Sequence, residues 1–256
     1  MNLTSIIKGM LNIQKKIDIQ KLPSQGLFYK KDFELFIKKA NIEDIIEYEY
    51  LYNKEDIGIV ITRLKKIVEK NTILLNNYTY NDIKSIDVVY LFIEIVKFTN
   101  NKPISLTYFN NIIGKDEIIN FESDTFNYMT INNDIMEKYD PKLCEIDFDG
   151  YKYSIPCIGL ENALTQFLIS KSENPGSEIY NSYSYDFIYF MGHKSHITFN
   201  EIDNLIQIFN FDISENDQKK IRKIVKTLSP IGKYSLKKGD QVIDVTAKID
   251  LSTIWK

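Results

Sequence analysis

Residues 22–29, LPSQGLFY, separate two stretches of regular sequence pattern. Pro23 favours an extended backbone at Leu22, and Gly26 permits a tight turn, so a preceding helix has to end here. The apolar and aromatic residues at 27–29 supply side chains that can be buried. We therefore expect a fixed structural corner, anchored by burial of Leu27, Phe28 and Tyr29, where the chain enters its first strand.

The segment before the corner predicts an amphipathic helix at residues 3–15, because its apolar residues recur at helical spacing. Ile6 and Met10 belong to this apolar set. A terminal helix of this kind has two readings. It packs on the chain's own core, or it docks as an arm on a neighbouring chain.

Periodicity and end signals predict the other elements. Helices are expected at 57–68, 80–98, 158–171, 185–192, 199–209 and 215–228, and the last two are preceded by the Thr198–Glu201 and Ser214–Asp217 capping patterns. Thr79 and Asp82 suggest the same start for the helix at 80–98. Strands are expected at 33–39, 104–109, 117–121 and 126–131, and hairpins at 144–155 and near Lys238-Gly239-Asp240.

These elements predict an α+β fold. A helical N-terminal part with a short sheet (1–101) precedes a β-rich middle (102–157), and a helical C-terminal part closed by a β-hairpin (158–256) follows. The chain ends in an apolar tail that contains Ile254 and Trp255. Such a tail is normally held down, either on the chain's own core or on a partner.

Composition restricts the class of protein. The 256 residues carry a net charge of −3, without the basic excess of a nucleic-acid-binding protein. The basic cluster at 219–223 is interpreted as the solvated face of a helix. No segment has the length and apolarity of a membrane span, no signal-peptide pattern is present at the N-terminus, and two cysteines make no disulfide framework. We expect a protein made in the cytosol.

Catalysis is not favoured by any residue pattern. Ser24 would need a base within hydrogen-bond reach to act as a nucleophile, and the only histidines are His193 and His196. The carboxylate pairs Glu43-Asp44 and Asp147/Asp149 are expected on exposed faces or turns, and there is no glycine-rich phosphate loop. We therefore expect no enzyme, no cofactor and no small-molecule substrate.

Two metal hypotheses remain open. Cys144, Cys157, His193 and His196 make one tetrahedral zinc set by number, although only the histidines are closely spaced. The stretch DFDG (147–150) resembles the start of a calcium loop, but the twelfth position is Ile158 instead of Glu. The alternative to a zinc site is two buried free thiols, and the alternative to a calcium loop is a simple hairpin turn.

Several short stretches, in order, resemble one family. LPSQGLFY is similar to the Leu-Pro-Ser-x-Gly-x-x-Tyr signature of baseplate hub proteins from T-even-like contractile-tailed bacteriophages. YNDIKSIDVVYLFIEI (80–95) resembles that family's helix with a central Asp, and YSIPCIGLENAL (153–164) its Pro-x-Ile-Gly-Leu step. HITFNEIDNLIQIFNF (196–211) and AKIDLSTIWK (247–256) resemble later motifs, so the similarity runs from about residue 18 to 256. Relatives with paired, closely spaced cysteines would suit zinc, and this chain lacks them.

The resemblance implies a structural role. The protein would be a virion component of the tail baseplate, present in the host cytoplasm during assembly and contacting other hub and tail proteins in a symmetric multi-copy assembly. The residues expected at its interfaces are Leu22, Pro23, Ser24, Gly26, Phe28, Tyr29, Ile6, Met10, Ile254 and Trp255. Alternatively, all of them stabilise the monomer.

Three further hypotheses compete with a hub subunit. The chain could be a transient hub assembly factor that is absent from the mature virion. It could be a zinc-binding module that uses the two cysteines and the two histidines. It could also be a DNA-binding accessory protein, although the net charge of −3 argues against that role.

Overall fold

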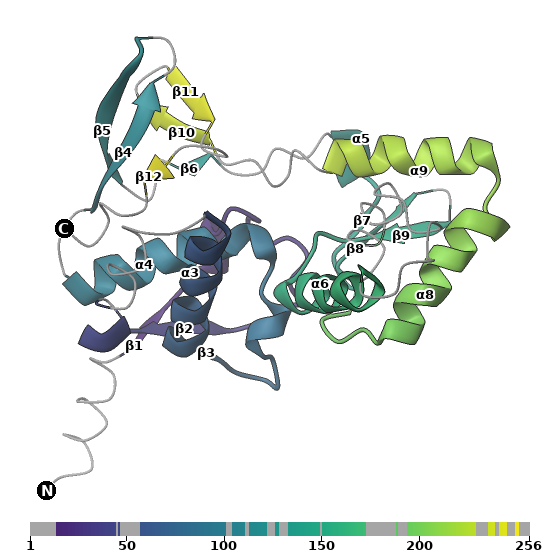
Figure 1. Ribbon diagram of the computed structural model, residues 1–256, viewed down its shortest axis with the longest axis horizontal. Coiled ribbons are helices and arrows are strands. Elements are labelled where there is room, and N and C mark those ends of the chain that lie inside the picture. Colours follow the sequence, from purple (N-terminus) through teal and green to yellow (C-terminus); the bar gives the residue numbers. More distant parts are fainter. Residues whose placement is uncertain are drawn as a thin grey trace, which may run out of the picture.

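The computed structural model describes residues 14–44, 46, 57–100, 104–110, 113–121, 126–127, 133–148, 150–172, 188, 194–228, 235–238, 241–244 and 249–250. Helices and small antiparallel sheets alternate along the chain, so the predicted α+β class is confirmed. Within these residues, no helix is long and apolar enough to cross a membrane. Figure 1 shows two lobes side by side and a group of strands above the first lobe.

The N-terminal lobe packs two helices on one sheet. Strands β1 (Gln14–Lys16), β2 (Leu35–Lys38) and β3 (Thr72–Leu74) form an antiparallel sheet in that order. Helices α3 (Ile57–Asn71) and α4 (Val88–Asn100) contact each other, and α4 also packs on β2. Helix α4 is apolar almost all round, with Val88 and seven of the next eight residues buried, which makes it the centre of the first hydrophobic core.

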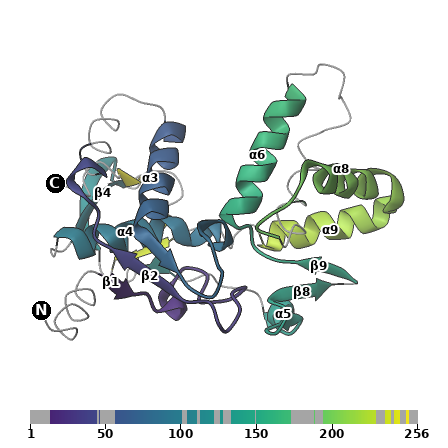
Figure 2. The ribbon, with the colours of Figure 1, turned by 90° about the horizontal axis from the view of Figure 1, so that it is seen from below.

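The C-terminal lobe has a second, separate core. Strands β7 (Tyr139–Asp140), β8 (Glu145–Phe148) and β9 (Tyr151–Tyr153) form a meander after the single-turn helix α5 (Asn133–Met136). Helices α6 (Ile158–Ser172), α8 (Phe199–Gln207) and α9 (Glu215–Leu228) bury their apolar faces with it. A π-helical turn, η5 (Ile208–Asp212), joins α8 to the segment before α9. Figure 2 shows α6, α8 and α9 on the side away from α3 and α4.

Two further sheets join distant parts of the chain. Strands β4 (Ile104–Asn110) and β5 (Lys115–Phe121) form a hairpin, and β12 (Ile249–Asp250) pairs with the other edge of β4. The predicted C-terminal hairpin, β10 (Ser235–Lys238) and β11 (Gln241–Asp244), pairs with β6 (Phe126–Asn127). The chain's end therefore returns to its middle.

Most predicted elements are confirmed. Helices α3, α6, α8 and α9 lie within a few residues of their expected bounds, and so do strands β2, β4 and β5 and the hairpins β8–β9 and β10–β11. Both predicted capping patterns are formed, at Thr198–Glu201 and at Ser214–Asp217. The exposed basic residues at 219–223 lie on α9, as expected for a solvated face.

Two predictions are wrong in part. The helix expected at 3–15 does not extend over Gln14 and Lys15, because these residues pair with β2 as strand β1. The helix expected at 80–98 begins only at Val88. Residues 80–82 and 85–87 form two short 3-10 turns, η2 and η3, separated by extended backbone at Ile83 and Lys84. Residues 6, 10, 185–187, 189–193, 254 and 255 lie outside the described part of the chain, so the predictions made for them stay predictions.

Removal of the Phe92 side chain tests the first core. Phe92 is fully buried in α4, so Phe92→Ala should lower the free energy of unfolding by about 3–5 kcal/mol, through lost burial and the cavity left behind. Phe211→Ala is the matched control, because Phe211 is 67% exposed and should cost less than about 0.5 kcal/mol. Urea denaturation of both variants provides the comparison, and equal losses would contradict this account of the core.

Candidate functional site

The corner at 22–29 inserts side chains into both hydrophobic cores. Leu22 and Tyr29 are buried in the N-terminal core, while Phe28, directly before Tyr29, is buried in the C-terminal core. The backbone takes an unusual path to direct these neighbouring side chains into different cores. Positive φ angles of 56°, 71° and 67° occur at Gln25, Gly26 and Phe28. The left-handed conformation at Phe28 costs about 1–2 kcal/mol, which burial of its ring offsets. The corner is therefore a clamp between the two lobes.

Asp87 holds the N-terminal half of this clamp. The backbone N–H of Ser24 donates to Asp87 Oδ1 at 2.8 Å, and the Tyr29 hydroxyl donates to Asp87 Oδ2 at 2.8 Å. The Tyr29 oxygen in turn accepts the backbone N–H of Lys84 at 2.8 Å. All these groups are buried, and Tyr29 also stacks on Phe33 with ring centroids 4.2 Å apart. One carboxylate thus fixes a segment more than fifty residues away in sequence.

Tyr139 holds the half of the corner that contacts the C-terminal lobe, at Phe28. The backbone N–H of Phe28 donates to the Tyr139 hydroxyl oxygen at 2.9 Å, and the two rings meet edge to face at 5.1 Å. Burial raises the pKa of Tyr139 to about 12, so the phenol stays protonated at neutral pH. Since Tyr139 belongs to β7, the corner is bound to the C-terminal sheet as well as to the segment that precedes α4.

A third segment, residues 153–164, completes the junction. Lys84 and Cys157 form an antiparallel β-bridge. The N–H of Ser85 donates to the Pro156 carbonyl at 3.0 Å, and the N–H of Ile158 donates to the Ile83 carbonyl at 2.9 Å. These bonds need extended backbone at residues 83 and 84, which is why the predicted helix cannot run through them. Helix α6 begins at the end of this bridge.

Gly159 allows a fourth segment to approach. A Cβ atom at this position of α6 would lie 1.9 Å from the carbonyl oxygen of Ser195, which precedes α8. Any residue larger than glycine would therefore push the two backbones apart. Stretches 22–29, 80–95 and 153–164, which carry the family resemblance, meet at this junction with Ser195, which directly precedes a fourth such stretch, 196–211.

The ionisable groups of the junction are strongly affected by burial. Burial raises the pKa of Asp87 to about 6, although hydrogen bonds from Ser24 and Tyr29 and the charge of Lys84 oppose the increase. Burial likewise raises the pKa of Tyr29, and the Asp87 charge adds to that effect. Lys84 is only 8% exposed, and burial lowers its pKa against the opposing pull of Cys157 and Cys144. The junction therefore holds a buried acid and a buried base.

Ser24 is not placed as a nucleophile. Its hydroxyl is buried and forms no hydrogen bond of ordinary geometry, although it helps to stabilise the Asp87 carboxylate. The other predicted interface residues of the corner, Leu22, Pro23, Phe28 and Tyr29, are buried in the chain itself, and Gly26 is half-buried. A contact between the corner and a partner remains a prediction.

The proposed metal ligands lie in different settings. Cys157 is buried, with its thiol 3.9 Å from the Lys194 carbonyl oxygen, and the Cys144 thiol lies 3.8 Å from the Pro141 carbonyl oxygen. His196 is exposed, and His193 lies outside the described residues. Among the described residues, no group of three or more His, Cys, Asp or Glu side chains could hold a metal ion. Asp147 Oδ1 accepts the N–H of Gly150 at 3.1 Å, as a hairpin turn requires.

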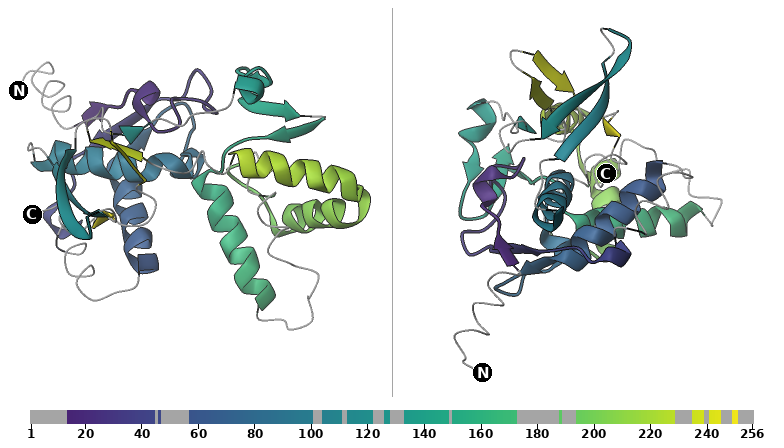
Figure 3. Two further views of the ribbon diagram at one scale, coloured as in Figure 1. Left: turned by 90° about the horizontal axis from the view of Figure 1, so that it is seen from above. Right: turned by 90° about the vertical axis from the view of Figure 1, so that its left-hand side faces the viewer.

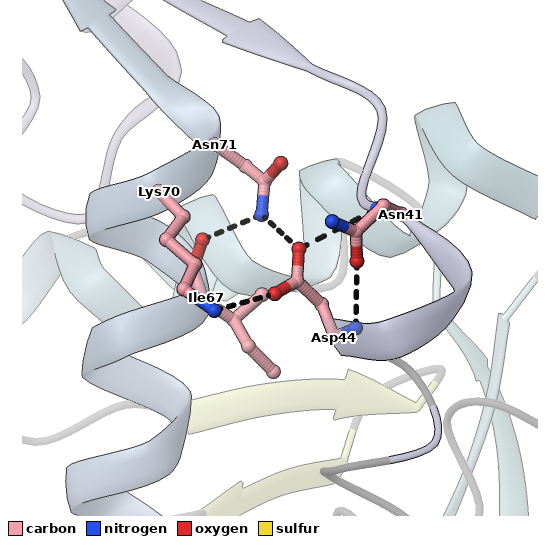
Figure 4. A network of polar contacts seen from close by, with 5 residues as sticks. All are labelled: Asn41, Asp44, Ile67, Lys70 and Asn71. Atoms are coloured by element: carbon pink, nitrogen blue, oxygen red, sulfur yellow. Dashed lines mark hydrogen bonds and ion pairs between the residues drawn. The ribbon is translucent and has the colours of Figure 1, made fainter.

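A second buried carboxylate, Asp44, was wrongly expected at the surface. Lys70 Nζ and Asn71 Nδ2, from the end of α3, donate to Asp44 Oδ1 and Oδ2 at 2.9 Å and 3.3 Å. Figure 4 shows this network. Asn41 Oδ1 also accepts the N–H of Asp44 at 2.7 Å. Burial alone would raise the pKa of Asp44, but these bonds outweigh it and hold the pKa below its ordinary value. The network ties residues 41–44 to α3 and offers no free catalytic group.

Comparison of the chain with models of protein families, with characterised proteins and with solved structures gives no match. Its function is therefore inferred from the junction and from the sequence resemblance.

Replacement of Asp87 by asparagine should change how stability depends on pH. The folded-state pKa of about 6 lies above the ordinary value of 3.8, so the folded state binds the proton more tightly. This contribution is complete below pH 4 and is lost as the pH rises through 6, at a cost of about 3 kcal/mol.

Asp87→Asn should remove this slope, because the amide can still accept the Ser24 N–H and carries no charge. The measurement is the free energy of unfolding of both proteins from pH 4 to pH 7. Parallel curves would show that Asp87 is not the titrating group.

Gly159→Ala separates helix propensity from backbone contact. In an ordinary helix the change would stabilise by about 0.5–1 kcal/mol. Here the clash with Ser195 should prevail and destabilise the protein by about 1–3 kcal/mol. Asn162→Ala, at an exposed position of the same helix, should be near neutral. Thermal unfolding of both variants is the measurement, and a stabilised Gly159→Ala variant would disprove the close approach.

Proposed function

We propose that the protein is a structural component of a bacteriophage tail baseplate hub, acting through protein–protein interfaces in tail assembly. The observation that carries the proposal is the junction. The stretches that resemble the hub family lie far apart in sequence, yet three of them contact one another through Asp87, Tyr29 and the Lys84–Cys157 bridge, and Gly159 contacts Ser195, directly before a fourth. Motifs that meet in this way support the resemblance better than motifs scattered over the chain.

The chemistry of the junction favours a scaffold. The side chains of Asp87, Tyr29 and Tyr139 accept hydrogen bonds from backbone N–H groups of other segments, which fixes the position of one segment against another. A second link between the lobes is the ion pair of Lys65 on α3 with Glu161 on α6, at 2.8 Å. A part that has to present fixed surfaces to several neighbours needs such a rigid arrangement of its lobes.

Surfaces for neighbours are available away from the junction. Phe211 and Ile208, three positions apart on η5, are 67% and 44% exposed. Exposed aromatic and aliphatic side chains of this kind are typical anchors of interfaces. In this proposal the corner sets the angle between the lobes, and exposed side chains such as these contact the other hub and tail proteins.

Mass spectrometry of finished, purified phage particles tests the proposal. We expect this chain in a small symmetric copy number per tail, such as three or six, because a hub component is built into the tail tip. Quantification against a tail protein of known copy number is the measurement. A protein from the same infected cells that is not part of the virion serves as the control for contamination.

A deletion of the gene separates a hub subunit from an assembly factor. Absence of the chain from particles, together with failed tail assembly in the deletion, would replace the hub subunit by a transient assembly factor. Absence from particles together with normal tails would overturn both. Bound metal in the purified protein would then decide whether the zinc-binding module takes their place.

A further inference from the structure

The hairpin of β4 and β5 leaves one long strand at the edge of a sheet. Strand β5 pairs with β4 along all of its residues from Lys115 to Phe121, and β12 pairs with the opposite edge of β4. In the described part of the chain, no strand pairs with the outer edge of β5. Figure 1 shows β5 on the outer side of this hairpin, and Figure 3 shows the hairpin projecting from the body of the molecule. An open edge presents unpaired backbone N–H and C=O groups to any strand that can reach it.

The centre of β5 lacks the usual protection of an edge. The register between β4 and β5 is continuous, without a bulge, and the strand contains no proline. Its charged residues, Lys115, Asp116 and Glu117, are gathered at one end. The central residue is Ile118, whose side chain is 67% exposed on the face that it shares with Thr107. A regular edge strand with an exposed β-branched residue at its centre is a ready template for pairing with another strand.

We propose that this edge binds a second copy of the same chain, with two β5 strands pairing antiparallel around a two-fold axis at Ile118. For two copies of this chain, the pattern of charge selects the antiparallel direction. An in-register parallel pair would place each charge directly opposite its own copy, which is unfavourable. The antiparallel pair places every charge opposite an uncharged residue: Lys115 faces Phe121, Asp116 faces Asn120, and Glu117 faces Ile119.

The resulting interface is self-complementary, as a two-fold dimer requires. The two three-stranded sheets would become one continuous six-stranded sheet, and Ile118 would face its own copy at the centre. The edge that is open in one chain is then closed in the pair. This proposal is independent of the baseplate assignment, because it concerns the purified chain alone.

Cysteine cross-linking tests the geometry directly. In the proposed dimer, Ile118→Cys brings two thiols together at the axis, so mild oxidation should give a disulfide-linked dimer as the main product. Ile113→Cys is the matched control, since Ile113 is also exposed on the same hairpin. Its two copies would lie about 33 Å apart in the paired strands, given a rise of about 3.3 Å per residue. The native Cys144 and Cys157 are buried and should not compete.

The oligomeric state gives the second measurement. Light scattering on the unmodified chain should give twice the monomer mass of 30.0 kDa, and Ile118→Lys should halve that mass without unfolding the protein. Ile118→Val should keep the dimer. A monomeric mass for the unmodified chain, equal cross-linking of the two cysteine variants, or a dimer indifferent to Ile118→Lys would each overturn the proposal.

Discussion

The carboxylate of Asp87 is the group on which the arrangement of this protein depends. It is buried between two hydrophobic cores, and it accepts hydrogen bonds from the backbone of Ser24 and the hydroxyl of Tyr29. Those bonds fix the path of the segment at 22–29 on the side of the N-terminal lobe and direct Tyr29 into that core, while Tyr139 holds Phe28 on the other side. A buried charge of this kind is costly, which explains why its pKa is raised even with both donors in place.

An apolar joint could have supplied equal or greater stability. Replacing a buried charged group and its partners by well-packed apolar residues is often neutral or stabilising. A hydrogen-bonded joint differs because its donors and acceptors match in only one arrangement, while apolar surfaces can slide over one another. For a protein that presents fixed surfaces to neighbours, a single angle between the lobes matters more than the last increment of stability. The conformation of Phe28, held in the left-handed region by Tyr139, fits the same requirement.

Local sequence patterns predicted the helices, caps and turns that depend on interactions between residues close together in the chain. Helices α8 and α9 have clear apolar faces, and the caps at Thr198 and Ser214 are completed within four residues, so the positions of these helices followed from the sequence. The hairpin of β8 and β9, whose register pairs Phe148 with Tyr151, did so for the same reason. The helix expected at 80–98 shows the limit of such patterns. Thr79 and Asp82 form the predicted reciprocal hydrogen bonds, but they close a 3-10 turn. Ile83 and Lys84 then bond to residues 156–158, which no pattern within residues 79–98 could indicate.

The candidate site was found in sequence only as separate pieces. The segment at 22–29 was identified as a corner, and Asp87 lay in a stretch noted for a central acidic residue, but nothing in either stretch says that the two are bonded. Tyr139 had no local signal at all, because a phenol that accepts one distant N–H looks ordinary in sequence. Gly159 was noted only as part of the Pro-x-Ile-Gly-Leu step, which does not say that it admits a distant carbonyl. Asp44 was misplaced at the surface for a related reason, since its partners Lys70 and Asn71 lie at the end of a different helix. The residues that define the geometry of this protein are those whose partners are far along the chain. A sequence supplies such residues individually, and only the fold supplies the pairs.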